Sequence, residues 1–138
     1  MSHVTLTWFR HDLRNEIIYN PIAPSAVPLF PGANVNLDPT RREGVELRIK
    51  QSLSNTWSLQ ATAQHVSPKF REGENVGNEI PLVAKNTLSA RLTWLPGDGR
   101  RADVGWQAAD SQRYGNDFAN TCSTRIPRFD TLDARYAW

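Results

Sequence analysis

The chain has 138 residues, of which 39% are hydrophobic and 22% charged, and its net charge is +2. This balance excludes an intrinsically disordered chain and a strongly basic nucleic-acid-binding tail. No apolar run approaches the roughly 18 residues of a membrane-spanning helix, whereas a spanning β-strand needs only about 9–11 residues, half of them apolar. The mean hydropathy of −0.53 is therefore compatible with a membrane protein built from strands.

Hydrophobic and polar residues alternate with a period of two in six stretches, and no helical period of 3.6 competes with them. The sequence predicts strands over Val4–Tyr19, Val45–Ser52, Trp57–Val66, Asn86–Leu95, Arg101–Asp110 and Phe129–Trp138. Long loops and tight turns alternate between these strands, which is typical of outer-membrane β-barrels. We therefore expect an all-β fold, an antiparallel up-and-down meander of about six strands.

The cleanest alternation lies in residues 45–50. Its apolar side chains share one face and its charged side chains, Glu46, Arg48 and Lys50, share the other. Charges in this pattern suit the hydrated lumen of a large barrel. A small soluble β-sandwich or β-barrel with one solvated face produces the same alternation, so this soluble ligand-binding module stands as the alternative.

Three tryptophans occupy the apolar phase of their strands, on the side of the tight turns. Trp57 follows one turn, Trp94 precedes the other, and Trp138 ends a strand that runs in the same direction. Because tryptophan favours the membrane–water interface, we expect these residues to form an aromatic girdle at one level. The alternative is that they are ordinary core residues.

The long connections, residues 20–40, 67–85 and 111–127, are rich in Gly, Asn, Pro and charge. In outer-membrane barrels such loops face the outside. Guanidinium groups and aromatic faces bind carboxylate-rich or catecholate-rich ligands well. The candidate ligand-binding residues are Lys69, Phe70, Arg71, Tyr114 and Phe118, although each of them could simply stabilise its own loop.

Other kinds of site find little support in the sequence. It contains no H-x-x-x-H or H-E-x-x-H pattern and no G-x-S-x-G, so we expect no metal site, no cofactor and no enzymatic activity. Arginines and aromatic residues mostly occupy opposite phases of the strands, which disfavours nucleic-acid binding. The single cysteine, Cys122, cannot form an internal disulfide.

Four stretches resemble the β-barrel of TonB-dependent outer-membrane receptors. In 36–47 a loop ends in a basic-Gly-aliphatic-Glu sequence, and 79–88 has an Ile-Pro pair followed by aliphatic and basic residues. Residues 125–133 resemble a late strand that begins after a proline and carries an Asp, and 9–19 matches a strand of the same region. Their order and spacing cover nearly the whole chain.

The resemblance implies a 22-stranded barrel in the outer membrane of a Gram-negative bacterium, filled by an N-terminal plug. Such receptors import ferric siderophores, haem, cobalamin or similar scarce ligands. The TonB complex of the inner membrane supplies the energy by pulling on a motif near the receptor's N-terminus. The implied partners are therefore outer-membrane lipid, the ligand and, only through the plug, the TonB complex.

Residues 1–138 lack the plug, the energy-coupling motif, most of the strands and the closing strand of a full receptor. The first residues also show no secretory signal, so we expect a mature segment or a truncated reading frame. The expected domain is thus a partial receptor barrel, an internal slice of its C-terminal part. Such a slice is expected to be unable to transport a ligand alone.

Overall fold

The computed structural model describes residues 1–20, 23–24 and 32–138. Within these ranges the chain is all-β and contains no helix. The strands are β1 (Ser2–Leu13), β2 (Ile17–Asn20), β3 (Ala33–Asn36), β4 (Thr40–Ser52), β5 (Trp57–Phe70), β6 (Asn86–Trp94), β7 (Arg101–Ala109) and β8 (Phe129–Ala137).

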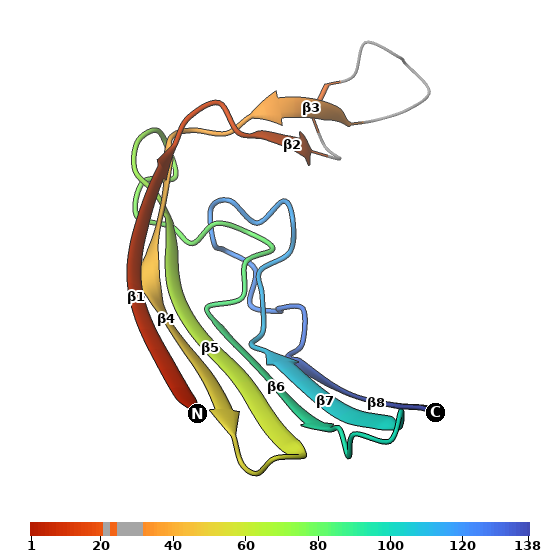
Figure 1. Ribbon diagram of the computed structural model, residues 1–138. Coiled ribbons are helices and arrows are strands. Elements are labelled where there is room, and N and C mark those ends of the chain that lie inside the picture. Colours follow the sequence, from red (N-terminus) through yellow and green to blue (C-terminus); the bar gives the residue numbers. More distant parts are fainter. Residues whose placement is uncertain (21–22, 25–31) are drawn as a thin grey trace.

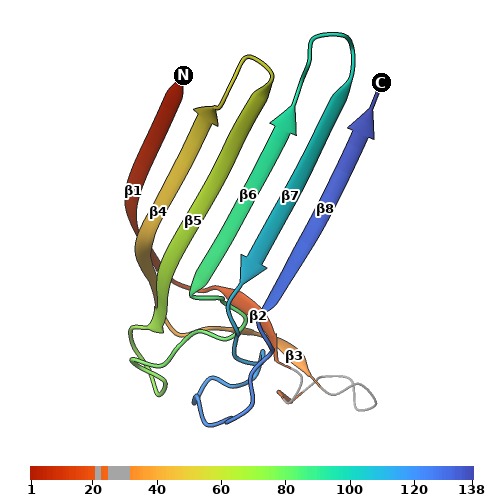
Figure 2. The same ribbon diagram turned by 90° about the horizontal axis from the view of Figure 1, so that it is seen from below.

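Six strands form one antiparallel sheet in the order β1-β4-β5-β6-β7-β8, and β2 pairs with β3 in a separate hairpin. Each of the six strands pairs with the next one along the chain, apart from the inserted hairpin, so the predicted antiparallel meander is confirmed (Figure 2). The sheet is strongly curved, and the connections after β5 and β7 lie on its hollow side (Figure 1). We call this side the concave face and the opposite side the outward face.

The register places most of the apolar residues of the six strands on the outward face. Its large exposed apolar side chains include Val4, Leu6, Trp8, Val45, Leu47, Leu88, Val104, Trp106, Leu132 and Tyr136. They are exposed: Leu6 retains 73% and Leu132 74% of its accessible surface. No second layer covers them within the described part of the chain. Since burying one such side chain is worth about 1.5–3 kcal/mol, this surface requires an apolar partner.

The apolar band on the outward face stops at nearly the same place on every strand. Toward the long loops, the outward positions become polar at Arg10, Glu43, His65, Asn86 and Asp130. A sharp border between apolar and polar side chains is what a strand shows where it leaves the hydrocarbon of a bilayer. We call this side the loop end of the sheet and the other side the turn end.

The turn end carries the predicted tryptophans. Trp57 lies opposite Trp94 in the β5–β6 register, with ring centroids 6.3 Å apart. The register across β6, β7 and β8 aligns Trp94 with Tyr136, so Tyr136 completes this row. Trp138 follows two residues beyond it, with its ring 5.9 Å from that of Tyr136.

The prediction of one strand over Val4–Tyr19 is wrong. β1 ends at Leu13, and a short break precedes β2 at Ile17. Asn15 adopts a left-handed backbone conformation with φ of 57°, which asparagine tolerates better than most residues and which a strand cannot contain. The chain therefore leaves the sheet at this point, and β2 pairs with β3.

Two predicted loops also begin or end differently from the expectation. β4 starts at Thr40 and β5 continues to Phe70, and these two residues pair with each other. The loop expected over 20–40 contains β3, and its residues 21–22 and 25–31 lie outside the described part.

The Gly, Asn, Pro and charge content of residues 67–85 predicts a loop that begins before Pro68. β6 pairs with β5 only as far as His65, and beyond it residues 78–80 lie beside β5, with the Ile80 amide donating to the Pro68 carbonyl at 3.0 Å. Pro68 therefore faces an irregular segment and not a central strand, which is where proline is tolerated.

Candidate functional site

The two long connections on the concave face form a small compact structure at the loop end. We call residues 71–85 and 110–128 the loop cap. The two segments are joined by a hydrogen bond from the Leu82 amide to the Arg113 carbonyl (3.0 Å) and by one from Asn78 Nδ2 to the Phe118 carbonyl (3.0 Å). Phe118 packs edge-on against Phe70 of β5, with ring centroids 6.2 Å apart. The cap is therefore fixed to the sheet as well as to itself.

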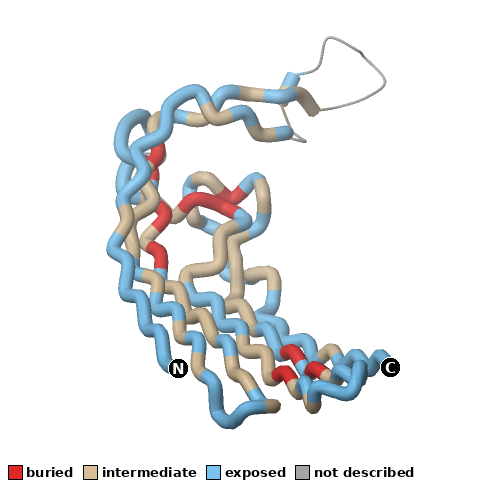
Figure 3. The backbone as a smooth tube through the Cα atoms, in the orientation of Figure 1, coloured by how far each residue is buried: buried red, intermediate tan, exposed pale blue. Residues whose placement is uncertain are grey.

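Burial supports this description. Figure 3 shows buried residues beneath the loop cap and a second group near the turn end, whereas most of β1 and β8 is exposed. The group beneath the cap consists of Thr40, Val66, Pro68, Phe70, Ile80, Pro81 and Asp117. The described residues thus bury their few core side chains where loops meet the sheet, and not between sheet layers.

Glu79 is the electrostatic centre of the loop cap. Its carboxylate lies 2.6 Å from Lys85 Nζ, 3.1 Å from Arg125 Nη2 and 3.3 Å from Arg113 Nε. Burial alone would raise the pKa of Glu79, but the hydrogen bonds from Lys85 and Arg125 outweigh it and hold the pKa below its usual value. The carboxylate therefore stays charged and ties both loop segments together.

Asp117 is a second centre within the cap. It pairs with Arg113 Nη1 at 2.8 Å and accepts hydrogen bonds from the backbone amides of Thr121 (2.8 Å) and Cys122 (3.1 Å). Its burial would raise the pKa, yet these bonds from Cys122, Arg113 and Thr121 lower it. Asn120, at φ of 57°, accepts a hydrogen bond from the Glu79 amide at 2.7 Å and so connects the two centres.

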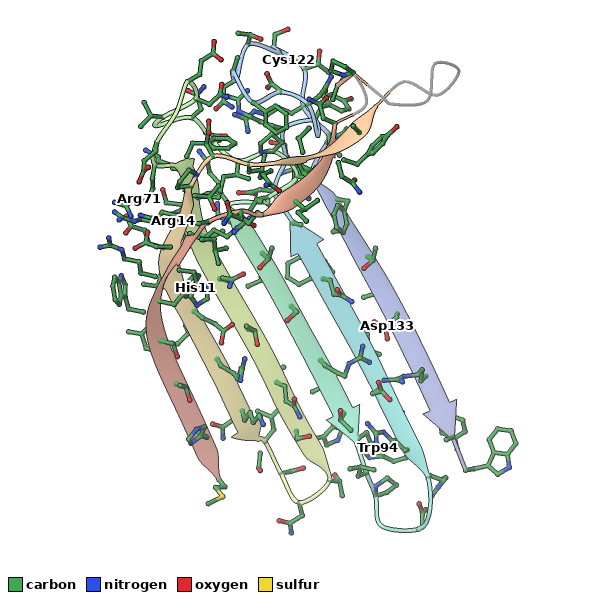
Figure 4. All side chains as sticks on the ribbon, turned by 90° about the horizontal axis from the view of Figure 1, so that it is seen from above. His11, Arg14, Arg71, Trp94, Cys122 and Asp133 are labelled. Atoms are coloured by element: carbon green, nitrogen blue, oxygen red, sulfur yellow. The ribbon has the colours of Figure 1, made fainter. Side chains whose placement is uncertain are left out.

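A second polar network lies on the concave face near the turn end. Arg91 of β6, Gly105 of β7 and Asp133 of β8 lie directly opposite one another in the register. Arg91 Nη2 donates to Asp133 Oδ1 at 2.9 Å across β7, and a Cβ at position 105 would overlap both side chains. Glycine therefore allows this cross-strand ion pair; Figure 4 shows Asp133 on β8.

Asp103 completes this network. Its side chain is only 3% exposed and pairs with both Arg91 and Arg135, the latter at 3.0 Å. Elsewhere on the concave face Arg48 pairs with Glu46 at 2.9 Å. The charged side chains of residues 45–50 thus lie on the concave face, as predicted. Most of the polar side chains of the other strands lie on the same face.

The structure separates the predicted ligand-binding residues into two groups. Phe70 and Phe118 pack against each other on the concave side, and Tyr114 is 42% exposed in the same loop cap. Lys69 lies opposite Arg41 at the outward positions of the strands. Arg71 pairs with Asp12, which is also an outward position, at 3.3 Å. The five residues therefore do not form one site.

Sequence reasoning missed the residues that build the loop cap, namely Glu79, Arg113, Asp117, Asn120 and Arg125. Two of them stand immediately before Ile-Pro pairs, at Ile80 and Ile126. Those motifs were used only for the resemblance. A charged residue before each Ile-Pro pair could have suggested that the two stretches meet through opposite charges.

Among the described residues, no group of three or more His, Cys, Asp or Glu side chains could hold a metal ion. The same residues include no helix long and apolar enough to cross a membrane. Glu79, Lys85, Arg113, Asp117 and Arg125 of the cap are instead paired with each other, and these ion pairs hold the two loop segments in position.

A family model described as TonB dependent receptor-like, beta-barrel, matches residues 1–138. A search of curated proteins finds no match to the chain. Members of the matched family are outer-membrane receptors that act as transporters and not as enzymes. The family match covers every strand of the sheet, and the outward apolar band agrees with it. The chain belongs to the β-barrel family of TonB-dependent receptors.

Proposed function

We propose that this chain forms part of the wall of a 22-stranded outer-membrane barrel that takes up a scarce ligand in a TonB-dependent manner. The ligand would be a ferric siderophore, haem, cobalamin or a compound of similar kind. The observation that supports this most is the exposed apolar band, which crosses all six strands and is bordered by polar residues at the loop end. Such a band matches hydrocarbon in a membrane.

The sheet edges also support a role as a barrel segment. Within the described ranges of the chain, β1 pairs only with β4 and β8 pairs only with β7. In lipid, each backbone group without a hydrogen bond costs several kcal/mol. Further strands of the receptor would satisfy β1 and β8, and the partial barrel of residues 1–138 would not transport a ligand by itself.

The loop cap is the proposed place of ligand contact. It covers the concave face at the loop end, and Tyr114 offers an exposed aromatic ring there. Phe118 would act indirectly, because its ring packs on Phe70 and holds the cap in place. Lys69 and Arg71, on the outward side, would contact a ligand only at the outer rim of the barrel.

A pair of neighbouring residues tests the membrane placement. A nitroxide label on Ala90→Cys would lie on the outward face, and one on Ser89→Cys would lie on the concave face. Both variants would carry Cys122→Ser, because Cys122 is free and exposed. In the full receptor in vesicles, we expect the label at 90 to collide with lipid-soluble oxygen and not with an aqueous nickel complex. Similar nickel accessibility at 89 and 90 would contradict a membrane-facing outward side.

Ligand binding by the full receptor tests the second half of the proposal. Ferric siderophores of the catecholate and hydroxamate types, haem and cobalamin would be titrated separately. We expect one class to bind and Tyr114→Ala to weaken its affinity roughly tenfold, a usual loss for an exposed aromatic contact. Tyr136→Ala, at the turn end, is the matched control. No binding in any class, or equal losses in both variants, would contradict this assignment.

A further inference from the structure

A group of basic side chains lies at the loop end of the outward face. We call it the outer basic cluster, and its members are Arg10, Arg14, Arg41, Lys69 and Arg71. Arg10 and Arg41 occupy outward positions of β1 and β4, and Lys69 lies beside Arg41 in the register. Arg14 and Arg71 are labelled at the loop end beside β1 in Figure 4, and they pair with Glu72 and Asp12 respectively.

The carboxylates nearby do not balance these cations. Asp12 is shared by three arginines, with contacts of 2.7 Å to Arg41, 3.2 Å to Arg10 and 3.3 Å to Arg71. Among the described residues, two further carboxylates contact or lie opposite a member of the cluster: Glu72, 4.0 Å from Arg14, and Glu43, opposite Arg10 in the register. Five cations therefore face three carboxylates. Because one carboxylate cannot use all the donors of three guanidinium groups, several N–H groups remain open to another anion.

The position of the cluster at the end of the apolar band indicates which chemical class of anion it would bind. Trp8 ends the apolar band on β1 and is 67% exposed, and Arg10 is the next outward residue. A molecule that touches both must combine an apolar part against Leu6 and Trp8 with an anionic group one step further along the strand. A phosphorylated lipid at the bilayer surface has this arrangement.

We propose that the outer basic cluster binds the phosphate group of a membrane lipid whose acyl chains lie against Leu6 and Trp8. Arginine suits this role because its planar guanidinium donates paired hydrogen bonds to phosphate oxygens. Asp12 Oδ1 contacts both Arg41 Nε at 2.7 Å and Arg71 Nη1 at 3.3 Å, and so holds the two guanidinium groups close together. The inference rests on the proposed placement of the chain in an outer membrane, and it assigns Lys69 and Arg71 to lipid.

The test compares two lipids with the same chains. The full receptor in detergent would be titrated with dioleoyl phosphatidic acid and, separately, with dioleoylglycerol, which lacks the phosphate, and bound lipid would be counted by native mass spectrometry. We expect phosphatidic acid to be retained and dioleoylglycerol to be lost. Inorganic phosphate should displace the lipid only weakly because it lacks acyl chains.

Variants locate the site. Arg41→Gln with Arg71→Gln removes two cations from the cluster, and Arg48→Gln with Arg101→Gln removes two from the concave face. Each surface cation is worth about 1 kcal/mol toward an anionic lipid, which is about fivefold per residue, so the first pair should weaken binding about 25-fold. The second pair should leave it nearly unchanged. Arg71→Lys, which keeps the charge, should retain most of the binding and shows that the fold at this position is intact.

Three results would overturn the proposal: equal retention of the two lipids, equal losses in the two double variants, or displacement by inorganic phosphate as effective as by phosphatidic acid. The last result would assign the cluster to a free anion.

Ligand binding by the same variants separates this inference from the proposed function. If Arg41→Gln with Arg71→Gln lost lipid but still bound ligand, receptor function would stand and the lipid site would be confirmed. If no receptor ligand bound while lipid binding followed the prediction, only the proposed uptake would fail.

Discussion

The two faces of the six-stranded sheet are made by the same strands but follow different rules. On the outward face, the large side chains in the middle of the strands are apolar, and most of them are exposed. On the concave face, charged side chains form defined pairs, such as Arg91 with Asp133 and Arg135 with Asp103. One face therefore depends on its surroundings, whereas the other is satisfied by the chain itself.

This difference has a physical reason. Apolar surface gains free energy from any hydrocarbon, because the hydrophobic effect is non-directional. Charged groups gain it only from partners at the right distance and orientation, because hydrogen bonds and ion pairs depend steeply on geometry. We therefore expect the outward face to be sensitive to charge and tolerant of shape, and the concave face to be sensitive to shape.

The largest effect is expected when the sheet is removed from the rest of the barrel. Residues 1–138 expressed alone should neither insert stably into liposomes nor mediate ligand flux, because β1 and β8 keep unpaired edges. Flux would be measured with the full receptor as the positive control. Ligand uptake into liposomes that contain only this chain would refute the prediction.

A charged side chain introduced on the outward face should destabilise the receptor more than one introduced on the concave face. Leu132→Arg points outward, and its neighbour Thr131→Arg points to the concave side. We expect the first to destabilise the full receptor by about 2–4 kcal/mol, the cost of arginine near the bilayer centre. The second should change stability by less than about 0.5 kcal/mol, as for other surface positions.

The free energy of unfolding in phospholipid vesicles, obtained from denaturant titration, measures both changes. The ratio of the two changes in the free energy of unfolding is the decisive quantity, more than either change alone. If Thr131→Arg proved as costly as Leu132→Arg, the assignment of outward and concave faces on β8 would be reversed.

A change of shape should affect the concave face. Gly105→Ala places a Cβ where the ends of Arg91 and Asp133 now lie. Those ends can move aside, so the loss is that of a partly exposed ion pair, about 1 kcal/mol in the free energy of unfolding. The same measurement on Gly105→Ala combined with Asp133→Ala should show less than the sum of the two single losses. Strict additivity would show that position 105 does not act through Asp133.

Acid should loosen the loop cap while leaving the sheet intact. Glu79 and Asp117 have lowered pKa values in the folded cap. Their contribution to stability is complete above their ordinary pKa values of about 4 and is lost as the pH falls through the lowered values. The protection factors for hydrogen exchange in residues 71–85 and 110–128 of the full receptor, which compare each amide with its intrinsic rate at the same pH, should therefore fall below about pH 4.

Glu79→Gln provides the control for this pH dependence. It keeps the size of the side chain but cannot titrate, so the cap should exchange faster at neutral pH and respond less to acid. An unchanged pH profile in this variant would show that Glu79 does not stabilise the cap through its charge.

Much of the fold could be predicted from the sequence. The meander, its tight turns and the residues that share each face all follow from a period of two, and the structure confirms them. The errors in the predicted strand bounds lie at positions that the period of two does not determine. The break at Asn15 depends on one left-handed residue, and the extension of β5 through Pro68 depends on its pairing with β4 and on residues 78–80, which take the place of β6 there. Local sequence contains neither fact in a readable form.

The candidate site was less predictable than the fold. Tyr114 and Phe118 lie in the part of the loop cap on the concave side, whereas Lys69 and the first cap residue, Arg71, lie toward the outward positions of Arg41 and Asp12. In a strand, neighbouring residues point to opposite faces, so Phe70 and Lys69 were bound to separate. Because β5 extends to Phe70, this rule applies there, but the sequence had indicated a loop.

The sequence by itself determined which side chains share a face and which connections are long, because strand periodicity is a property of the local backbone. Only the tertiary structure decided that residues 71–85 and 110–128 meet, since the contact between Glu79 and Arg125 joins positions 46 residues apart. It also decided that three arginines converge on Asp12. Contacts of this kind depend on how separate strands and loops are brought together, and no local pattern specifies that.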